Sequence, residues 1–229
     1  MANKVNIVLV HGAWGEGMHW NKVIPLLAAE GHNVVAVQCP LTSLADDAET
    51  VRRTVSQLEG KSLLAGHSYG GAIITEAAGK IPGTAGLVYI AAFAPDETEN
   101  LAALLQKGQP APGGANIYPD EYGFLWIKRD KFRESFCQDA TAEEALVMAS
   151  TQRPIAGRCF EDKPTSTGWK HFPVWYQVSS EDRMIPPDAQ RFMADRMKAE
   201  TITLDASHAS LATRPVEIAG FISKAAGAI

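Results

Sequence analysis

The stretch Ala65-Gly66-His67-Ser68-Tyr69-Gly70-Gly71 carries the strongest structural signal in this sequence. Residues 61–65 are typical of a short buried strand, and residues 72–78, which follow the quoted stretch, are typical of a helix. A serine on so sharp a turn between strand and helix is held in a strained conformation that exposes its hydroxyl group. The turn requires small residues two positions on either side, and Gly66 and Gly70 meet that requirement. We therefore predict that Ser68 is a nucleophile; the alternative is a glycine-rich surface turn.

The length and charge of the chain limit the classes of protein to which it can belong. At 229 residues it is long enough for one α/β domain spanning 1–229 and short for two. The 21 basic and 26 acidic residues give a formal net charge of −5, which disfavours nucleic acid and anionic membranes as partners. No apolar run approaches the roughly 18 residues of a membrane-spanning helix. We expect a globular protein that acts on a small molecule; the oligomeric state stays open.

The N-terminus and the cysteines predict a cytoplasmic protein. The chain enters its first apolar run without the charged region and cleavage site of a secretory signal. Cys39, Cys137 and Cys159 are odd in number and lack the spacing of metal ligands. We interpret them as reduced thiols, which are usual in the cytoplasm.

The first half of the chain alternates apolar runs with helical patterns. Residues 5–10 form a nearly continuous apolar run, as expected for a strand covered on both faces. Asp46, Asp47 and Glu49 fit the first turn of a helix, where the helix dipole favours negative charge. The expected order is strand 5–10, helix 21–30, strand 34–37, helix 45–58, strand 61–65, helix 72–78 and strand 86–91. This alternation predicts right-handed crossovers and a mostly parallel, doubly wound sheet.

The alternation stops at about residue 96 and resumes after about residue 168. The intervening segment contains a Gly/Pro-rich patch at 108–114, a cluster of aromatic residues, and helical patterns near 131–137 and 142–150. Its aromatic and apolar content disfavours a disordered linker. We therefore predict a largely helical cap inserted at about 96–168. The expected elements after it are strand 174–178, helix 187–197, strand 201–204 and helix 215–225.

A serine nucleophile needs a base within hydrogen-bond reach, and His208 is our candidate. It follows the last expected strand, so it lies at the carboxyl end of the sheet, where open α/β folds bind ligands. An imidazole there can accept a proton and return it near neutral pH. Of the remaining histidines, we expect His67 to be buried beside Ser68 and His11 to order its own loop. We expect the other three to be solvated: His19, His32 and His171.

The base in turn needs a carboxylate to hold its tautomer and to stabilise the imidazolium. Asp182 lies in the loop after the strand at 174–178, again at the carboxyl end of the sheet. Asp205, three residues before His208, is the alternative. The order Ser68, Asp182, His208 is the one expected for α/β-hydrolases and differs from the orders of chymotrypsin and subtilisin.

The tetrahedral intermediate of such a reaction needs amide donors for its oxyanion. The residue after the nucleophile, Tyr69, supplies one amide, and Ala13, in the glycine-rich loop after the first strand, is the candidate for the second. Trp14 would form an aromatic wall of the substrate pocket. This loop lacks the Lys-Ser/Thr of a P-loop and the spacing of a dinucleotide-binding loop. We expect neither a metal site nor a cofactor.

Four segments resemble the α/β-hydrolase superfamily, and the resemblance covers the whole chain. They are Val8-Leu-Val-His-Gly-Ala-Trp14, Pro25-Leu-Leu-Ala-Ala-Glu-Gly-His32, Gly66-His-Ser-Tyr-Gly-Gly71 and Asp182-Arg-Met-Ile-Pro186. They look closest to a branch of plant methylesterases, hydroxynitrile lyases and small bacterial esterases. The resemblance implies an α/β-hydrolase fold, a triad of Ser68, Asp182 and His208, and oxyanion donors at Ala13 and Tyr69.

The sequence departs from the lyases of that branch at two positions. They carry a threonine after the first histidine and a lysine after the catalytic one, where this chain has Gly12 and Ala209. The cation that would stabilise departing cyanide is absent, which favours ester hydrolysis. An Ala209→Lys, Gly12→Thr double change is expected to gain weak lyase activity.

We therefore expect a cofactor-free hydrolase of small or medium, apolar carboxylic esters. The alternatives are a lactonase, lyase or perhydrolase on the same scaffold, or a slow-turnover ligand receptor that keeps an intact triad.

Overall fold

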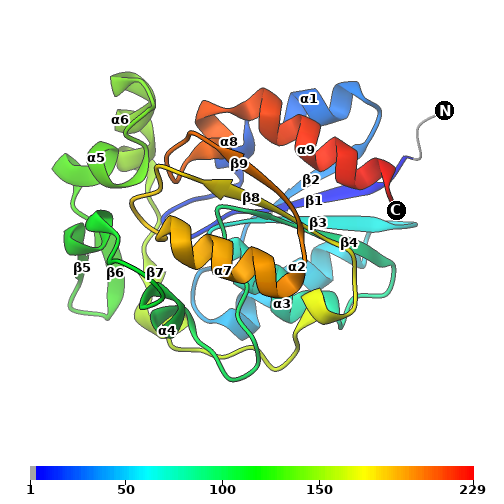
Figure 1. Ribbon diagram of the computed structural model, residues 1–229, viewed down its shortest axis with the longest axis horizontal. Coiled ribbons are helices and arrows are strands. Elements are labelled where there is room, and N and C mark those ends of the chain that lie inside the picture. The colour runs from blue at the N-terminus through cyan, green and yellow to red at the C-terminus, as the bar shows by residue number, and fades with distance from the viewer. Residues whose placement is uncertain (1–3) are drawn as a thin grey trace.

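Six parallel strands form the central sheet, in the order β2-β1-β3-β4-β8-β9 (Figure 1). The computed structural model describes residues 4–229; the start of the chain, where the sequence predicts no secretory signal, lies partly outside that range. The strands are β1 (Asn6–Val10), β2 (Asn33–Val37), β3 (Ser62–His67), β4 (Thr84–Ile90), β8 (Val174–Ser179) and β9 (Glu200–Leu204). The α/β-hydrolase fold predicted from the sequence is confirmed, and every expected strand is present within two residues of its predicted bounds.

Helices cover both faces of this sheet. Successive side chains of a strand point to opposite faces, so a continuous apolar run makes both faces apolar. On β1, Ile7 and Leu9 belong to one buried cluster, while Val8 and Val10 belong to the other. The first cluster packs under α1 (Ile24–Ala29) and α9 (Pro215–Gly227). The second packs under α2 (Leu44–Val55), α3 (Tyr69–Ala78) and α7 (Pro187–Met197).

Two helical details differ from the sequence prediction. The helix expected at 21–30 is shorter than predicted, since α1 spans Ile24–Ala29, and a 3-10 turn at Gly17–Trp20 precedes it. Pro25 lies in the first turn of α1, where its missing N–H costs no helical hydrogen bond, so the helix starts there and not earlier. A four-residue helix, α8 (Ser210–Thr213), follows His208 and is too short for its periodicity to be recognised.

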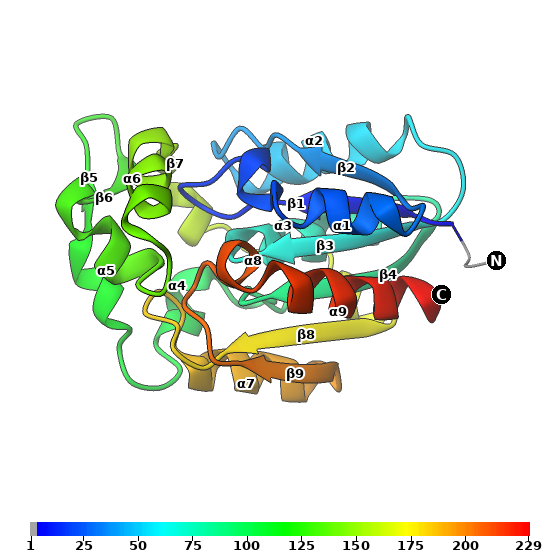
Figure 2. The same cartoon turned by 90° about the horizontal axis from the view of Figure 1, so that it is seen from above.

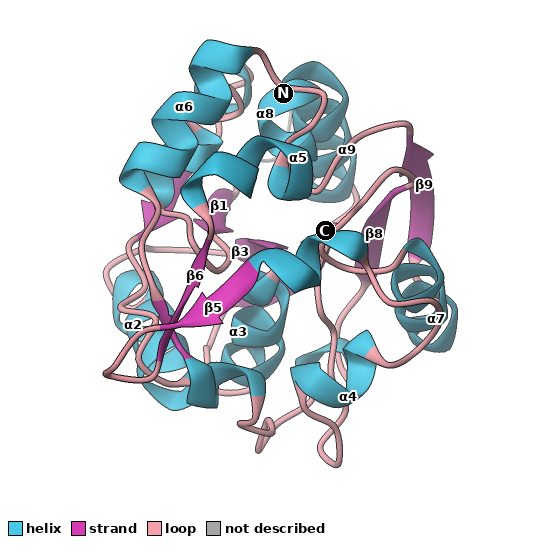
Figure 3. Cartoon of the chain, turned by 90° about the vertical axis from the view of Figure 1, so that its left-hand side faces the viewer, coloured by secondary structure: helices cyan, strands magenta, loops and turns pink. Residues whose placement is uncertain are grey.

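Most of the segment between β4 and β8 lies across the carboxyl ends of the strands, at the end of the molecule opposite the two termini (Figures 1 and 2). Figure 3 looks onto this segment from outside. It contains α4 (Leu101–Leu105), β5 (Ile117–Pro119), β6 (Phe124–Ile127), α5 (Phe132–Phe136), α6 (Ala142–Thr151) and β7 (Ile155–Ala156). The helices near 131–137 and 142–150 are confirmed.

The inserted segment also contains strands, beside the expected helices. Strands β5, β6 and β7 form a small antiparallel sheet, and six of their residues are aromatic or β-branched: Ile117, Tyr118, Phe124, Trp126, Ile127 and Ile155. Strands of two to four residues are too short to show a period of two in the sequence. Among residues 4–229, no helix is long and apolar enough to cross a membrane.

Candidate active site

Ser68 lies at the turn between β3 and α3, in a conformation that few residues other than glycine adopt. Its backbone angles are φ 55° and ψ −123°, and such strain persists only where the surroundings impose it. A Cβ atom on Gly66 would lie 2.4 Å from the carbonyl oxygen of Gly70, and one on Gly70 would lie 2.4 Å from that of Val10. The two glycines are therefore required by space, as the sequence predicts for this turn.

His208 lies within hydrogen-bond distance of both other residues expected to form a triad, Ser68 and Asp182. His208 Nε2 is 2.8 Å from Ser68 Oγ, and His208 Nδ1 is 2.7 Å from Asp182 Oδ2. A carboxylate only accepts hydrogen bonds, so the Nδ1 atom carries the proton and Nε2 is left to accept one from the hydroxyl group. The side chains of His208 and Asp182 are fully buried.

Asp182 is oriented by three donors from its own loop and from α7. Its Oδ1 accepts hydrogen bonds from the backbone N–H groups of Met184 and Ile185, at 2.7 and 2.9 Å. Its Oδ2 also accepts one from Gln190 Nε2, at 2.8 Å. The alternative acid, Asp205, is exposed and accepts a hydrogen bond from the Ser180 hydroxyl instead of from His208. Gln190 is fully buried on α7, and the sequence analysis did not predict its role.

Two hydrogen bonds fix the peptide group between Ser68 and Tyr69. The Ser68 carbonyl oxygen accepts hydrogen bonds from the N–H groups of Gly71 and Phe93, both at 3.0 Å. In a trans peptide the N–H points away from the C=O. Two donors on one side therefore hold the Tyr69 N–H on the other side, where no protein group accepts from it among the described residues.

The Ala13 amide is held in the same way, with the help of His11. Because the backbone N–H of Cys39 donates to His11 Nε2 at 3.0 Å, the proton of that imidazole lies on Nδ1. Nδ1 donates to the Gly12 carbonyl oxygen at 2.9 Å, which fixes the peptide whose N–H belongs to Ala13. Burial lowers the pKa of His11 to about 4, so this ring is neutral at pH 7. The expectation that His11 orders its loop is supported by these contacts.

Of the histidines expected to be solvated, His19 is in fact buried. Its side chain packs against Phe136 at a centroid distance of 6.1 Å, and burial lowers its pKa to about 4. The prediction failed because Phe136 is 117 residues away in the sequence. His67 is buried, as expected, and its Nε2–H donates to the backbone oxygen of His208 at 2.8 Å. Burial holds the pKa of His67 well below its usual range.

The inserted segment supports the loops that carry the base and the acid. The ring of Phe136, on α5, meets the His208 ring edge-on, with 4.9 Å between centroids. Gln138 Nε2 donates to the Glu181 carbonyl oxygen at 2.7 Å, and Asp139 Oδ2 accepts from the Ser207 N–H at 3.1 Å. The sequence carries no signal for these contacts, because each joins residues at least 43 positions apart.

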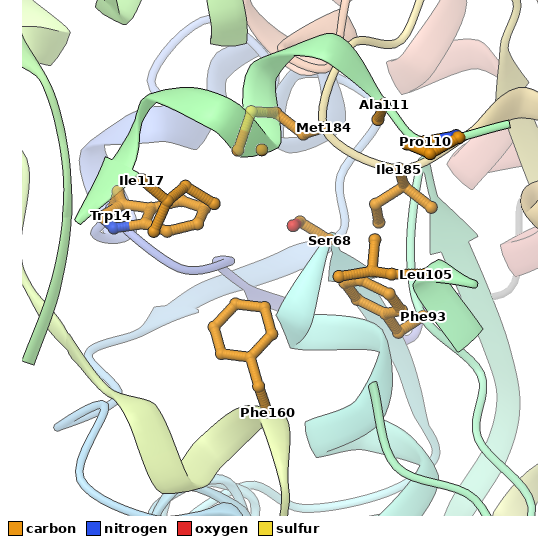
Figure 4. Close-up of a pocket in the computed structure, with 11 residues that line it drawn as sticks. Trp14, Ser68, Phe93, Leu105, Pro110, Ala111, Ile117, Phe160, Met184 and Ile185 are labelled. Atoms are coloured by element: carbon orange, nitrogen blue, oxygen red, sulfur yellow. The ribbon is translucent and has the colours of Figure 1, made fainter. Parts of the chain in front are cut away.

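A cavity of about 190 Å³ opens in front of Ser68, and its wall is almost wholly apolar (Figure 4). Trp14, Ile117 and Phe160 lie to one side of the serine hydroxyl, and Phe93 and Leu105 lie to the other. The full lining is Trp14, Ser68, Phe93, Leu105, Pro110, Ala111, Gly114, Ile117, Phe160, Met184 and Ile185. The indole N–H of Trp14 donates to the Leu125 carbonyl oxygen at 2.9 Å, so the aromatic wall expected at Trp14 is anchored to the inserted segment.

No group of three or more histidine, cysteine or acidic side chains within residues 4–229 is arranged to hold a metal ion. The three cysteines are buried and unbonded to one another.

Comparison with known proteins identifies the family of this chain. The model of the alpha/beta hydrolase family matches residues 7–221. The chain belongs to that family. Methylesterase 1 and alpha-hydroxynitrile lyase, both from Arabidopsis thaliana, are 26% and 27% identical to it over 97% and 88% of this chain and 96% and 88% of their own. The solved structure of a pyrethroid hydrolase from Sphingobium faniae aligns with a TM-score of 0.84 and 25% identity, over 99% of this chain and 98% of that one. The resemblance to methylesterases and hydroxynitrile lyases is thereby confirmed.

This α/β hydrolase also buries a carboxyl group directly behind its nucleophile turn. Asp47, in the first turn of α2, is fully buried and accepts a hydrogen bond from the Tyr69 hydroxyl at 2.7 Å. Burial raises the pKa of Asp47 to about 6. The sequence predicts that Asp47 is a charge favoured by the helix dipole, but the structure places its side chain in the core, against Tyr69.

This raised pKa predicts how Asp47 affects stability. A folded state that holds the proton more tightly than the unfolded chain is favoured at low pH, and that advantage is lost as the pH rises from about 4 through about 6. A shift of roughly two pH units corresponds to about 3 kcal/mol. We expect the unfolding free energy of the wild type, minus that of Asp47→Asn, to fall by about this amount over that interval. Urea denaturation at several pH values measures it; Asp46→Asn, on the exposed side of the same turn, is the control. A difference that rises with pH would contradict the prediction.

Proposed function

We propose that this α/β hydrolase is a serine esterase that cleaves small or medium carboxylic esters, apolar on both sides of the ester group. The observation that carries the proposal is the alignment of Ser68, His208 and Asp182 at 2.8 and 2.7 Å, at the floor of an apolar cavity. Relatives named as esterases and hydrolases support the same class of reaction.

The proposed reaction proceeds in two halves through an acyl-enzyme. Ser68 Oγ attacks the carbonyl carbon while its proton passes to His208 Nε2, and the amides of Ala13 and Tyr69 stabilise the resulting oxyanion. The bond to the leaving oxygen then breaks, and that oxygen takes the proton from His208. In the second half, water attacks the acyl carbon, gives its proton to His208, and the free acid departs as Ser68 recovers the proton. Asp182 keeps the imidazole in the required tautomer throughout.

The lining of the cavity indicates the substrate class. Ser68 is the one lining residue whose side chain carries a hydroxyl, carboxyl, amino or amide group. An unpaired charge in such a cavity costs several kcal/mol, since nothing replaces its water shell. The substrate is therefore a neutral ester without a charged group in either half.

A matched pair of esters tests this proposal. We expect p-nitrophenyl butyrate to be hydrolysed with a kcat/KM at least about 100-fold above that of p-nitrophenyl hemisuccinate, whose acyl chain is similar in length but ends in a carboxylate. Steady-state release of p-nitrophenol measures both, and sustained turnover also separates an enzyme from a slow receptor. Equal rates on the two esters would contradict the substrate class, and no turnover of either would contradict the esterase.

A separate assay, of cyanide release, addresses the lyase alternative. Ala209 supplies no cation for departing cyanide, so we expect mandelonitrile to release no more cyanide with the wild type than with Ser68→Ala. Contrary to the expectation from the sequence, the Ala209→Lys, Gly12→Thr double change should not gain lyase activity. A Cβ atom on Gly12 would lie 2.6 Å from Ser68 Cβ and 3.1 Å from its Oγ, and would displace the nucleophile.

A further inference from the structure

We propose that Asp47 is a positioning residue that holds both amides of the oxyanion hole, through Tyr69 on one side and through the backbone from Cys39 to Leu41 on the other. The inference rests on the proposed function, because it assigns a role within that reaction.

The first connection runs from Asp47 to the Tyr69 amide. Asp47 Oδ2 accepts the Tyr69 hydroxyl at 2.7 Å, and both side chains are fully buried. Tyr69 therefore cannot change rotamer without breaking a buried hydrogen bond, and a buried acceptor left unsatisfied is costly. Because Tyr69 is the first residue of α3, this anchor restrains the peptide between Ser68 and Tyr69, whose N–H faces the site.

The second connection runs from Asp47 to the Ala13 amide, over a longer path. Asp47 Oδ1 accepts the Leu41 N–H at 2.7 Å. Leu41 has a φ of 62°, a conformation that bulky residues rarely adopt, so this hydrogen bond helps to hold a strained backbone. The chain from Leu41 back to Cys39 passes through one residue, Pro40, whose φ is fixed by its ring.

Cys39 completes the path at His11. The Cys39 N–H donates to His11 Nε2 at 3.0 Å, and His11 Nδ1 donates to the Gly12 carbonyl at 2.9 Å. The N–H on the other side of that peptide is the Ala13 amide. The two carboxylate oxygens of Asp47 thus lead to the two oxyanion donors through buried, directional contacts.

The identity of the residue fits this role better than a simple structural one. A carboxylate offers two acceptor atoms in one rigid plane, which suits two donors that converge from separate segments. Asp46, one position earlier, has an exposed side chain and accepts a hydrogen bond from the Thr42 hydroxyl, outside this path. It provides a matched control, because Asp46→Asn removes the same charge from the same helical turn.

Kinetics of three variants test the role of Asp47. Displacing an amide donor of the oxyanion hole by up to about 1 Å lowers the rate by roughly 10- to 100-fold. We expect Asp47→Ala to lower kcat on p-nitrophenyl butyrate by about 10- to 100-fold and Tyr69→Phe by about 10-fold. KM should stay within about twofold in both, because the ground-state ester is held by the apolar wall. Asp47→Asn, which can still bond both partners, should lose no more than about threefold, and Asp46→Asn should match the wild type.

A trifluoromethyl ketone separates positioning from general damage, because the hemiketal that it forms with Ser68, as the serine proton passes to His208, places an oxyanion in the same site. Its inhibition constant should rise in Asp47→Ala and Tyr69→Phe by the factor lost in kcat, while that of the corresponding methyl ketone changes little. If Asp47→Ala fails to fold, Tyr69→Phe, which keeps the buried ring, decides the question. A Tyr69→Phe variant with wild-type kcat and ketone affinity would overturn the proposal. A loss of kcat in Asp46→Asn equal to that in Asp47→Ala would overturn it as well.

A measurement on the resting protein keeps this inference distinct from the proposed function. Absence of ester turnover in the wild type would refute the esterase but would leave the network to be tested by amide NMR. In Tyr69→Phe we expect the amide resonances of residue 69 and of Ala13 to shift relative to the wild type. An unchanged Ala13 resonance would show that Asp47 does not join the two halves.

Discussion

Replacing Ser68 with alanine is expected to lower kcat for ester hydrolysis by about 10⁵- to 10⁶-fold, because the variant has no atom to form the acyl-enzyme. The fold should survive, since the substitution removes one oxygen and leaves Gly66 and Gly70 in place. In the wild type, a fluorophosphonate should add once per chain, at Ser68, because the turn between β3 and α3 holds its hydroxyl 2.8 Å from His208 Nε2. Mass spectrometry of the labelled peptides locates the adduct.

The control for this experiment is Ser180→Ala. The Ser180 hydroxyl donates to Asp205, away from His208, so this variant should keep the wild-type rate and the wild-type adduct. Labelling at another residue, or substantial activity in Ser68→Ala, would refute the assignment of the nucleophile.

Replacing Asp182 with asparagine is expected to lower kcat by about 10⁴-fold while the protein stays folded. The backbone N–H groups of Met184 and Ile185 both donate to one oxygen of this side chain, so the amide oxygen of asparagine must take that place. Its NH₂ group then faces His208 Nδ1, which has to become the acceptor. The imidazole proton moves to Nε2, and the base can no longer take the proton of Ser68.

The matched variant is Asp205→Asn, which changes an exposed carboxylate that contacts Ser180 and lies three residues from the base. We expect its kcat to stay within about threefold of the wild type, since an exposed polar contact contributes little. Nitrogen-15 NMR of the His208 ring measures the tautomer directly. A larger loss in Asp205→Asn than in Asp182→Asn would assign the acid to Asp205.

The features that follow from short stretches of sequence were predicted well. The alternation of buried strands and helices appears within windows of about ten residues, and it determined the parallel sheet and the order of its elements. The turn at Ser68 was recognisable because its requirements, a strand, two small residues and a helix, all lie within some fifteen positions. The candidate base and acid could be chosen because parallel strands end at the same edge, so the loops after β8 and β9 had to approach Ser68.

The features that depend on distant partners could not be predicted. Asp47 had the pattern of a surface charge at a helix start, and its contact with Tyr69 places it in the core instead. His19 occupies a turn, yet Phe136 of the inserted segment covers it.

The choice between Asp182 and Asp205 shows where this boundary falls. The sequence by itself determined the fold and the set of residues that reach one edge of the sheet. The tertiary structure alone decided which of them meet, because Ser68 and His208 are 140 positions apart and hydrogen bonds act over about 3 Å. A sequence pattern records which apolar side chains turn inward, whereas the burial and the partners of polar side chains are decided only when the whole chain packs.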